Sequence, residues 1–290
     1  MPRPQKLTAA CLMALMTPAY AEFSGRNALE HTRTLVSFGP RPPGSPGMKK
    51  AQAYIVKHLK EQGWQVREDD FTARTPAGPM AMKNIIAMRA GTSGKAVAIT
   101  GHYDTKIFPF LFVGANDGGS SAGFLLEMAR ALKSVPLKNT VYLVFFDGEE
   151  AVREWTAEDS LYGSRRLAAQ WQKDRTLSTL EALINVDMIG DRDLRILREQ
   201  YSSDSLMRLI WSVARQLGLS QYFSGPALAI EDDHVPFLRL GVRAANLIDF
   251  EYGPDNSWWH TKEDTLDKLS PDSFEVVGRV LIEVLKRLDE

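Results

Sequence analysis

Apolar and polar positions along this chain form a repeating pattern that predicts strands and helices in turn. Five apolar runs of strand length are rich in Val and Ile: 84–90, 96–104, 140–147, 181–190 and 242–250. Five segments with helical periodicity follow them: 120–134, 159–173, 202–218, 233–241 and 270–290. Strands that are apolar on both faces and alternate with helices imply an α/β fold, with a mostly parallel sheet covered on both faces.

The segment before these runs predicts two further helices, joined by the Pro- and Gly-rich loop 38–47. Local polar residues suggest where two later helices begin. Asp159 or Ser160 is expected to cap the helix at 159–173. One of Asp232 and Asp233 is expected to cap the short helix that follows them, which leaves the other for the candidate site.

The first 21 residues differ from the rest of the chain. "MPRPQK" is short and basic, "LTAACLMALM" is an apolar run, and Ala19 and Ala21 form an A-x-A arrangement. This pattern predicts a signal peptide over 1–21, cleaved near Ala21, and export to the periplasm or outside the cell. The alternative is a buried N-terminal helix. The run is too short to span a bilayer, so no transmembrane anchor is expected.

Composition agrees with a globular protein of one large domain or two small ones. The chain has 290 residues, of which 44% are hydrophobic and 24% charged, and its formal net charge is −1. That balance gives no reason to expect a nucleic-acid partner, because phosphates call for a basic surface. The only cysteine is Cys11, which would leave with the signal peptide, so no disulfide is expected. The sequence does not fix the oligomeric state.

Residues that can bind a metal or carry a proton follow the predicted strands. They are His102 and Asp104, Asp117, Glu149 and Glu150, Asp187, and His260. In parallel sheets ligands bind outside the carboxyl ends of the strands, so these side chains are expected to meet. Carboxylate and imidazole donors without a thiolate favour zinc. A cation would also offset the repulsion between the adjacent carboxylates of Glu149 and Glu150.

Each of these residues alone also has a structural explanation. Asp117 lies in an N-D-G-G stretch that favours a turn, and adjacent glutamates often begin a solvated helix. The functional interpretation depends on their recurrence at consecutive strand ends.

Five motifs carry a resemblance to a known family. In chain order, "GHYDTK", "VGANDGG", "FFDGEEA", "NVDMIG" and "WWHT" resemble zinc-dependent exopeptidases of the aminopeptidase type. "FFDGEEAVREWTAEDSLYGSRRLA" and "EDDHVPFLRLGV" resemble their glutaminyl cyclase branch, the glutaminyl-peptide cyclotransferases. The similarity covers the chain from about Asn27 to its end. It implies a zinc-exopeptidase-like single catalytic domain over 22–290 that converts N-terminal glutamine of peptides or proteins to pyroglutamate, with release of ammonia.

The resemblance also implies a metal site and a catalytic group. Asp117, Glu150 and His260 would hold one zinc ion. Glu149 would be the general acid/base. In a one-zinc cyclase, His102 would lie next to the metal ligands without binding the metal itself.

Other roles follow from the same resemblance. Asp187 and Asp232 would form an acidic hydrogen-bond network beside Glu149. Trp155 and Trp259 would line the pocket for the glutamine side chain, with packing under a loop as the structural alternative. Asn246 would be a third substrate-binding residue, offering a neutral hydrogen bond.

Three positions depart from the family pattern. Gly118 stands where serine is frequent, Asn246 where the animal enzymes often have histidine, and Glu231 where glutamine is common. These changes leave the metal ligands intact and affect the expected rate and pH profile.

A second enzyme hypothesis uses the same residues. In a secreted two-zinc aminopeptidase, Asp117 would bridge two metals, with His102 and Asp187 on one and Glu150 and His260 on the other. Glu149 would then activate water. Every ligand is present, so the inventory alone does not decide between the two enzymes. A binding module on an inactive hydrolase scaffold is disfavoured, because neither a ligand nor the base is missing.

Overall fold

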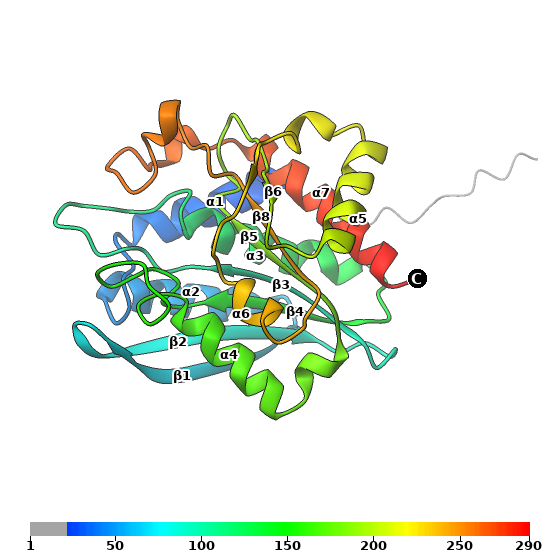
Figure 1. Cartoon of the computed structure of the whole chain (residues 1–290), viewed down its shortest axis with the longest axis horizontal. Helices are drawn as coiled ribbons and strands as arrows, with labels where there is room; N and C mark the ends of the chain where they lie inside the picture. The colour runs from blue at the N-terminus through cyan, green and yellow to red at the C-terminus, as the bar shows by residue number, and fades with distance from the viewer. Residues whose placement is uncertain (1–21) are drawn as a thin grey trace, which may run out of the picture.

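A mixed six-stranded sheet forms the centre of the computed structural model, which describes residues 22–290 (Figure 1). Its strands are β1 (Gln65–Thr75), β2 (Gly78–Arg89), β3 (Ala96–His102), β4 (Thr140–Phe146), β5 (Leu180–Asp187) and β8 (Ala244–Ile248). They lie in the order β1-β2-β4-β3-β5-β8. β4, β3, β5 and β8 are mutually parallel, whereas β2 is antiparallel to both β1 and β4. The expected mostly parallel sheet is confirmed, and the expected signal peptide lies outside the described residues.

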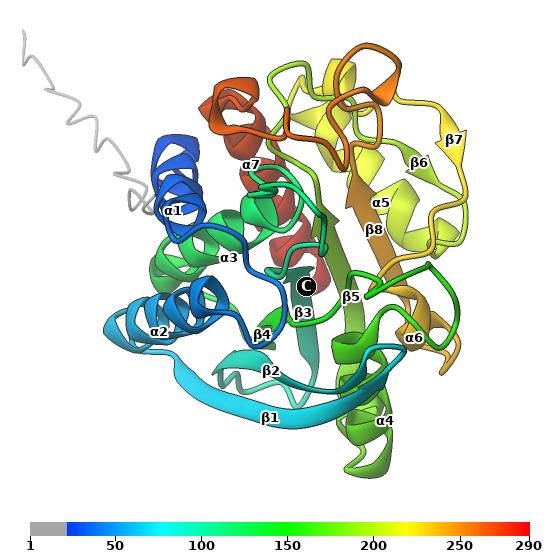
Figure 2. The same ribbon diagram turned by 90° about the vertical axis from the view of Figure 1, so that its left-hand side faces the viewer.

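Helices cover both faces of the sheet (Figure 2). One face packs against α1 (Gly25–Ser37), α2 (Pro46–Glu61), α3 (Gly119–Ala131), α5 (Asp204–Gln216) and α7 (Pro271–Leu288). The other face carries α4 (Tyr162–Lys173) and α6 (Val235–Leu238). Short elements complete the fold: the paired strands β6 (Arg198–Glu199) and β7 (Ala227–Leu228), and the 3-10 helices η1 (Leu132–Ser134), η2 (Thr176–Thr179), η3 (Ser220–Tyr222), η4 (Pro254–Asn256) and η5 (Leu266–Lys268).

The hairpin of β1 and β2 is the main element that the apolar pattern did not predict. β1 reads "QVREDDFTART" and most of it is exposed, because it is the edge strand of the sheet. An edge strand with one solvated face carries charged residues, so it has no apolar run. β2 begins at Gly78 rather than near residue 84, because its first half pairs only with β1.

The two expected helix caps were wrong. α4 begins after Leu161, whose φ of 52° is left-handed, and no side chain caps it. The carboxylate of Asp159 instead accepts hydrogen bonds from the backbone N–H groups of the preceding loop. α6 also lacks a side-chain cap: Val235 N–H donates to the backbone carbonyl of Asp232. The side chain of Asp232 is therefore free to serve the site.

Close packing of α1 against α3 depends on Gly123. A Cβ atom at this position would lie 2.1 Å from Thr32 Oγ1 and 2.7 Å from the Ala28 carbonyl oxygen. We expect Gly123→Ala to lower the free energy of unfolding by about 1–3 kcal/mol, because an added methyl in a packed interior forces the helices apart. Chemical denaturation of the two proteins measures this, and equal midpoints would contradict the close approach.

Within residues 22–290, we find no helix with the length and apolar character that crossing a membrane requires.

Candidate active site

The loops that follow β3, β4 and β8 reach the same edge of the sheet and extend to the left in Figure 1. A cavity of about 400 Å³ opens there, within the range of small-molecule sites. Eight of the expected residues line it: Asp117, Glu149, Glu150, Trp155, Asp187, Asp232, Trp259 and His260. The convergence of strand ends that the sequence suggested is therefore present.

Asp117, Glu150 and His260 form one group of potential metal ligands. His260 Nε2 lies 3.0 Å from Glu150 Oε1 and 3.1 Å from Asp117 Oδ2. The three ligand atoms all lie within 4.8 Å of one another. Asp117 precedes α3, Glu150 follows β4, and His260 lies in the loop after β8.

This donor set fits a zinc ion. Asp117 Oδ2 is buried and close to the imidazole, yet it accepts no hydrogen bond from it. His260 Nε2 and Glu150 Oε1 lie within hydrogen-bond distance of each other, so the buried oxygen left without a partner, which a metal ion would satisfy, is Asp117 Oδ2. Three imidazole and carboxylate donors with a free fourth direction are typical of catalytic zinc sites.

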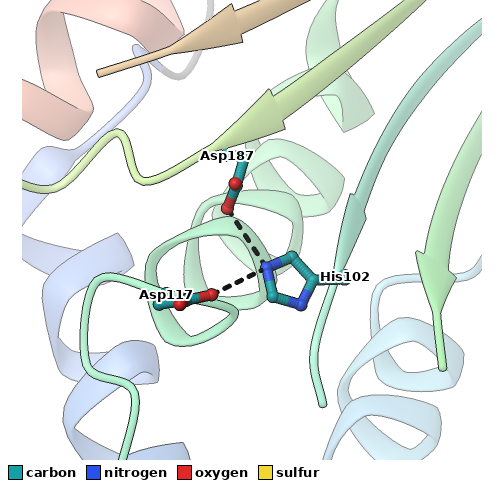
Figure 3. Close-up of side chains that lie close together, drawn as sticks. All are labelled: His102, Asp117 and Asp187. Atoms are coloured by element: carbon teal, nitrogen blue, oxygen red, sulfur yellow. Dashed lines mark hydrogen bonds and ion pairs between the residues drawn. The ribbon is translucent and has the colours of Figure 1, made fainter. Parts of the chain in front are cut away.

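A second group contains His102, Asp117 and Asp187 (Figure 3). His102 Nε2 lies 3.1 Å from Asp187 Oδ1 and 3.2 Å from Asp117 Oδ1. Asp117 therefore belongs to both groups and lies between them. The structure brings together every ligand of the two-metal hypothesis as well as those of the one-metal hypothesis.

The buried carboxylates differ in their affinity for protons. Burial raises the pKa of Glu149 well above its usual range, and the charges of Glu150 and Asp232 add to this against the opposing charge of His102. Burial also raises the pKa of Asp187 to about 7, although His102 opposes it. For Asp117, the adjacent imidazoles of His102 and His260 outweigh burial and hold the pKa below its usual range. Of these three carboxyl groups, only Asp117 has a lowered pKa.

Asp232 lies in a buried polar network beneath the cavity. Asn246 Nδ2 donates to Asp232 Oδ2 at 2.7 Å, and Asn185 Nδ2 donates to Asp232 Oδ1 at 3.1 Å. Asn185 also donates to Asn246 Oδ1 and accepts from Thr100 Oγ1. Asn246 was expected to bind substrate, but it is fully buried and does not line the cavity. Its side chain orients Asp232.

The two expected aromatic residues lie in different surroundings. Trp259 stacks on the ring of His260 at 4.0 Å and meets Phe250 edge-on. Trp155 lines the cavity and is 40% exposed, so it is not packed under its loop. Both indoles line the cavity that contains the potential metal ligands, and Trp259 contacts one of them directly.

The loop that carries Asp117 is held by hydrogen bonds with two residues that the sequence alone did not identify, Arg41 and Asp264. Arg41, fully buried, donates to the carbonyl oxygens of Tyr103, Val113 and Gly114. Asp264 accepts hydrogen bonds from the backbone N–H groups of Asn116 and Asp117, at 2.7 and 3.2 Å. The only sequence signals were an arginine in a Pro-rich loop and an aspartate shortly after His260.

The departure at Gly118 has a steric reason. Its φ is 73°, and a Cβ atom there would lie 2.3 Å from the Asp104 carbonyl oxygen. The carboxylate of Asp104 in turn accepts from the N–H groups of Glu149 and Glu150. The turn around Gly118 thus brings Asp117 close to the residues that follow β4. Glu231, another departure, lines the cavity and pairs with Arg239 at 2.6 Å.

The sequence of this chain matches a known protein family and a curated relative. Residues 84–285 match the family model "Peptidase family M28". The chain is 32% identical over 273 residues to the glutaminyl-peptide cyclotransferase-like protein of Bos taurus, covering 83% of this chain and 70% of the relative.

Two solved structures are similar over nearly their whole length. The crystal structure of an Acidobacteriales bacterium glutaminyl cyclase has a TM-score of 0.90 and 39% identity, covering 99% of both chains. A Zn-dependent exopeptidase from Parabacteroides distasonis has a TM-score of 0.82 and 26% identity, covering 92% of this chain and 99% of the other.

Proposed function

This chain belongs to peptidase family M28 and, within it, to the glutaminyl-peptide cyclotransferases. From this membership and from its site, we propose that it converts the N-terminal glutamine of peptides or proteins to pyroglutamate and ammonia. The observation that carries the proposal is one cavity in which Glu149 stands beside the ligand group of Asp117, Glu150 and His260, with Trp155 on the same lining. We further propose one zinc ion per chain, and export after cleavage near Ala21.

The proposed roles follow from the donor groups. Asp117, Glu150 and His260 would hold a zinc ion, whose positive charge would polarise a carbonyl oxygen. The substrate's α-nitrogen forms a bond to its own side-chain amide carbon, and the bond from that carbon to the amide nitrogen breaks. Glu149 takes a proton from the α-amine and returns it to the departing ammonia. The attack is intramolecular, so a pocket that holds the folded-back conformer accelerates it.

The surroundings of Glu149 suit this proton transfer. A general acid/base works best when its pKa lies near the working pH, and burial raises the pKa of Glu149 well above its usual range. Its Oε2 atom lies 3.9 Å from Nδ1 of His102, which is also buried. Asp187 and Asp232, which line the same cavity, are proposed to orient the substrate amine and the Glu149 carboxylate.

The group of His102, Asp117 and Asp187 favours a second candidate, a two-zinc aminopeptidase. In that enzyme Glu149 would activate water, and the product would be a free amino acid. Two measurements on the same preparation separate the candidates: metal content per chain, and turnover of a Gln-initiated beside a Leu-initiated peptide. One zinc with turnover of the Gln peptide alone supports the cyclase. Two zinc ions with release of leucine would overturn it.

Trp155 provides a test of the proposed pocket. An indole wall favours the compact substrate conformer and excludes water that would compete as a nucleophile. We expect Trp155→Ala to lower kcat/KM for glutamine cyclisation by at least about tenfold, as losses of shape complementarity in substrate pockets do. The melting temperature should change little, because the side chain is 40% exposed. Unchanged kcat/KM with a lower melting temperature would make Trp155 a packing residue.

A further inference from the structure

Arg153 places an unneutralised positive charge on the lining of the cavity. The residue is exposed and lines the cavity beside Trp155. Its guanidinium forms no ion pair within residues 22–290, unlike that of Arg166, which binds Asp69 through two nitrogens. A free guanidinium is a fork of donors that matches a carboxylate.

The two other charged side chains near the cavity mouth that line the cavity, Lys106 and Glu231, have ion-pair partners. Lys106 Nζ lies 3.5 Å from Glu150 Oε2 and donates to the Ala151 carbonyl oxygen. Glu231 pairs with Arg239. Glu154, next to Arg153, is exposed and does not line the cavity. The part of a bound ligand that extends out of the cavity would therefore meet the unpaired charge of Arg153.

The backbone at Arg153 is fixed by Asp159. Oδ2 of this buried carboxylate accepts from the N–H groups of Arg153 and Glu154, at 2.9 and 3.1 Å. Its Oδ1 accepts from Val152 N–H at 2.9 Å and from Tyr162 Oη at 2.7 Å. Charge-assisted hydrogen bonds of this kind hold a loop firmly. The backbone from which the Arg153 side chain extends is thus fixed beside the cavity.

We propose that Arg153 selects substrates with an acidic residue directly after the N-terminal glutamine. The proposal rests on the proposed function: the glutamine occupies the inner cavity, so the next residue lies at its mouth. A carboxylate there can accept two parallel hydrogen bonds from the guanidinium. A lysine or arginine side chain at the same position is repelled, which sharpens the discrimination.

The test compares kcat/KM for three peptides that differ only at the second position: Gln-Glu-Ala, Gln-Ala-Ala and Gln-Lys-Ala. Exposed ion pairs are individually weak, so we expect the acidic peptide to exceed the neutral one by about 2- to 5-fold. It should exceed the basic peptide by about 5- to 20-fold, because attraction is replaced by repulsion. Both ratios should shrink when the salt concentration rises from 0.05 to 0.5 M.

Two variants and a matched control assign the effect to one side chain. Ratios are measured within each protein, so a general change in rate cancels. Arg153→Gln should bring the Glu/Lys ratio close to one, and Arg153→Glu should invert it. Arg215→Gln removes an exposed arginine of α5 that does not line the cavity, and it should keep the wild-type ratio.

The outcomes separate this inference from the proposed function. Equal turnover of the three peptides by the wild type, or an unchanged preference in Arg153→Glu, would overturn the role of Arg153 and leave the cyclase proposal standing. Pyroglutamate from none of the three peptides would overturn the proposed function, and the inference with it.

Discussion

Glu149→Gln is expected to bind zinc and fold normally while kcat falls by about 10²- to 10⁴-fold, the usual contribution of a general acid/base. Glu149 lines the cavity but belongs to neither group of potential metal ligands. The substitution keeps the shape of the side chain and removes its ability to take up a proton. It also removes a carboxylate that is buried beside Glu150 and Asp232, so the folded state should not be weakened.

The control for this prediction is metal content. Zinc per chain and the midpoint of thermal unfolding should match those of the wild type, which places the loss in the chemical step. Glu158→Gln, a change at an exposed glutamate outside the cavity, should leave both kcat and metal content as they are. Near-full activity of metal-replete Glu149→Gln would remove Glu149 from the reaction.

Glu150→Gln should instead lose both the metal and the activity. Glu150 is 4% exposed, and its Oε1 atom lies 3.0 Å from His260 Nε2. An amide is a poor zinc ligand, and removing even a residue behind the ligands typically costs 10- to 100-fold in metal affinity. We expect the loss of a direct ligand to exceed that range. The measurement is zinc occupancy after dialysis against a chelator of known affinity, together with activity at saturating zinc.

The pair of adjacent glutamates makes this comparison informative. Both substitutions remove one carboxylate from the same dipeptide, so differences between them report position and not net charge. Retention of full zinc occupancy by Glu150→Gln under competition would contradict its role as a ligand. It would then favour the second group, His102 with Asp117 and Asp187, as the metal site.

The positions of the strands and the convergence of their ends could be predicted from the sequence. Buried parallel strands leave uninterrupted apolar runs, and their carboxyl ends must meet at one edge of the sheet. Asp117, Glu150 and His260 were found in this way, although they come from three separate segments. β1 was missed because it is an edge strand with a solvated face, and such a strand has no uninterrupted apolar run.

Residues that act through distant backbone groups could not be predicted. Arg41 contacts carbonyl oxygens 62 to 73 positions away, and Asp264 holds N–H groups 147 and 148 positions away. No local pattern encodes such pairs. Asp159 was misassigned because an aspartate before a helix is a good cap, and only the folded loop shows that its oxygens serve the segment preceding it. Asn246 was expected at the substrate pocket, but a resemblance between sequences does not show how deeply a side chain is buried.

The most direct test of the central claim uses one substrate with two possible fates. Wild-type protein with zinc is incubated with Gln-Ala-Ala, and the products are identified by mass spectrometry. A cyclase closes the ring and releases ammonia, which leaves the whole peptide as its pyroglutamyl form. An aminopeptidase breaks the first peptide bond and releases free glutamine and Ala-Ala. We predict intact pyroglutamyl peptide with one ammonia per turnover; free glutamine with Ala-Ala would contradict the account.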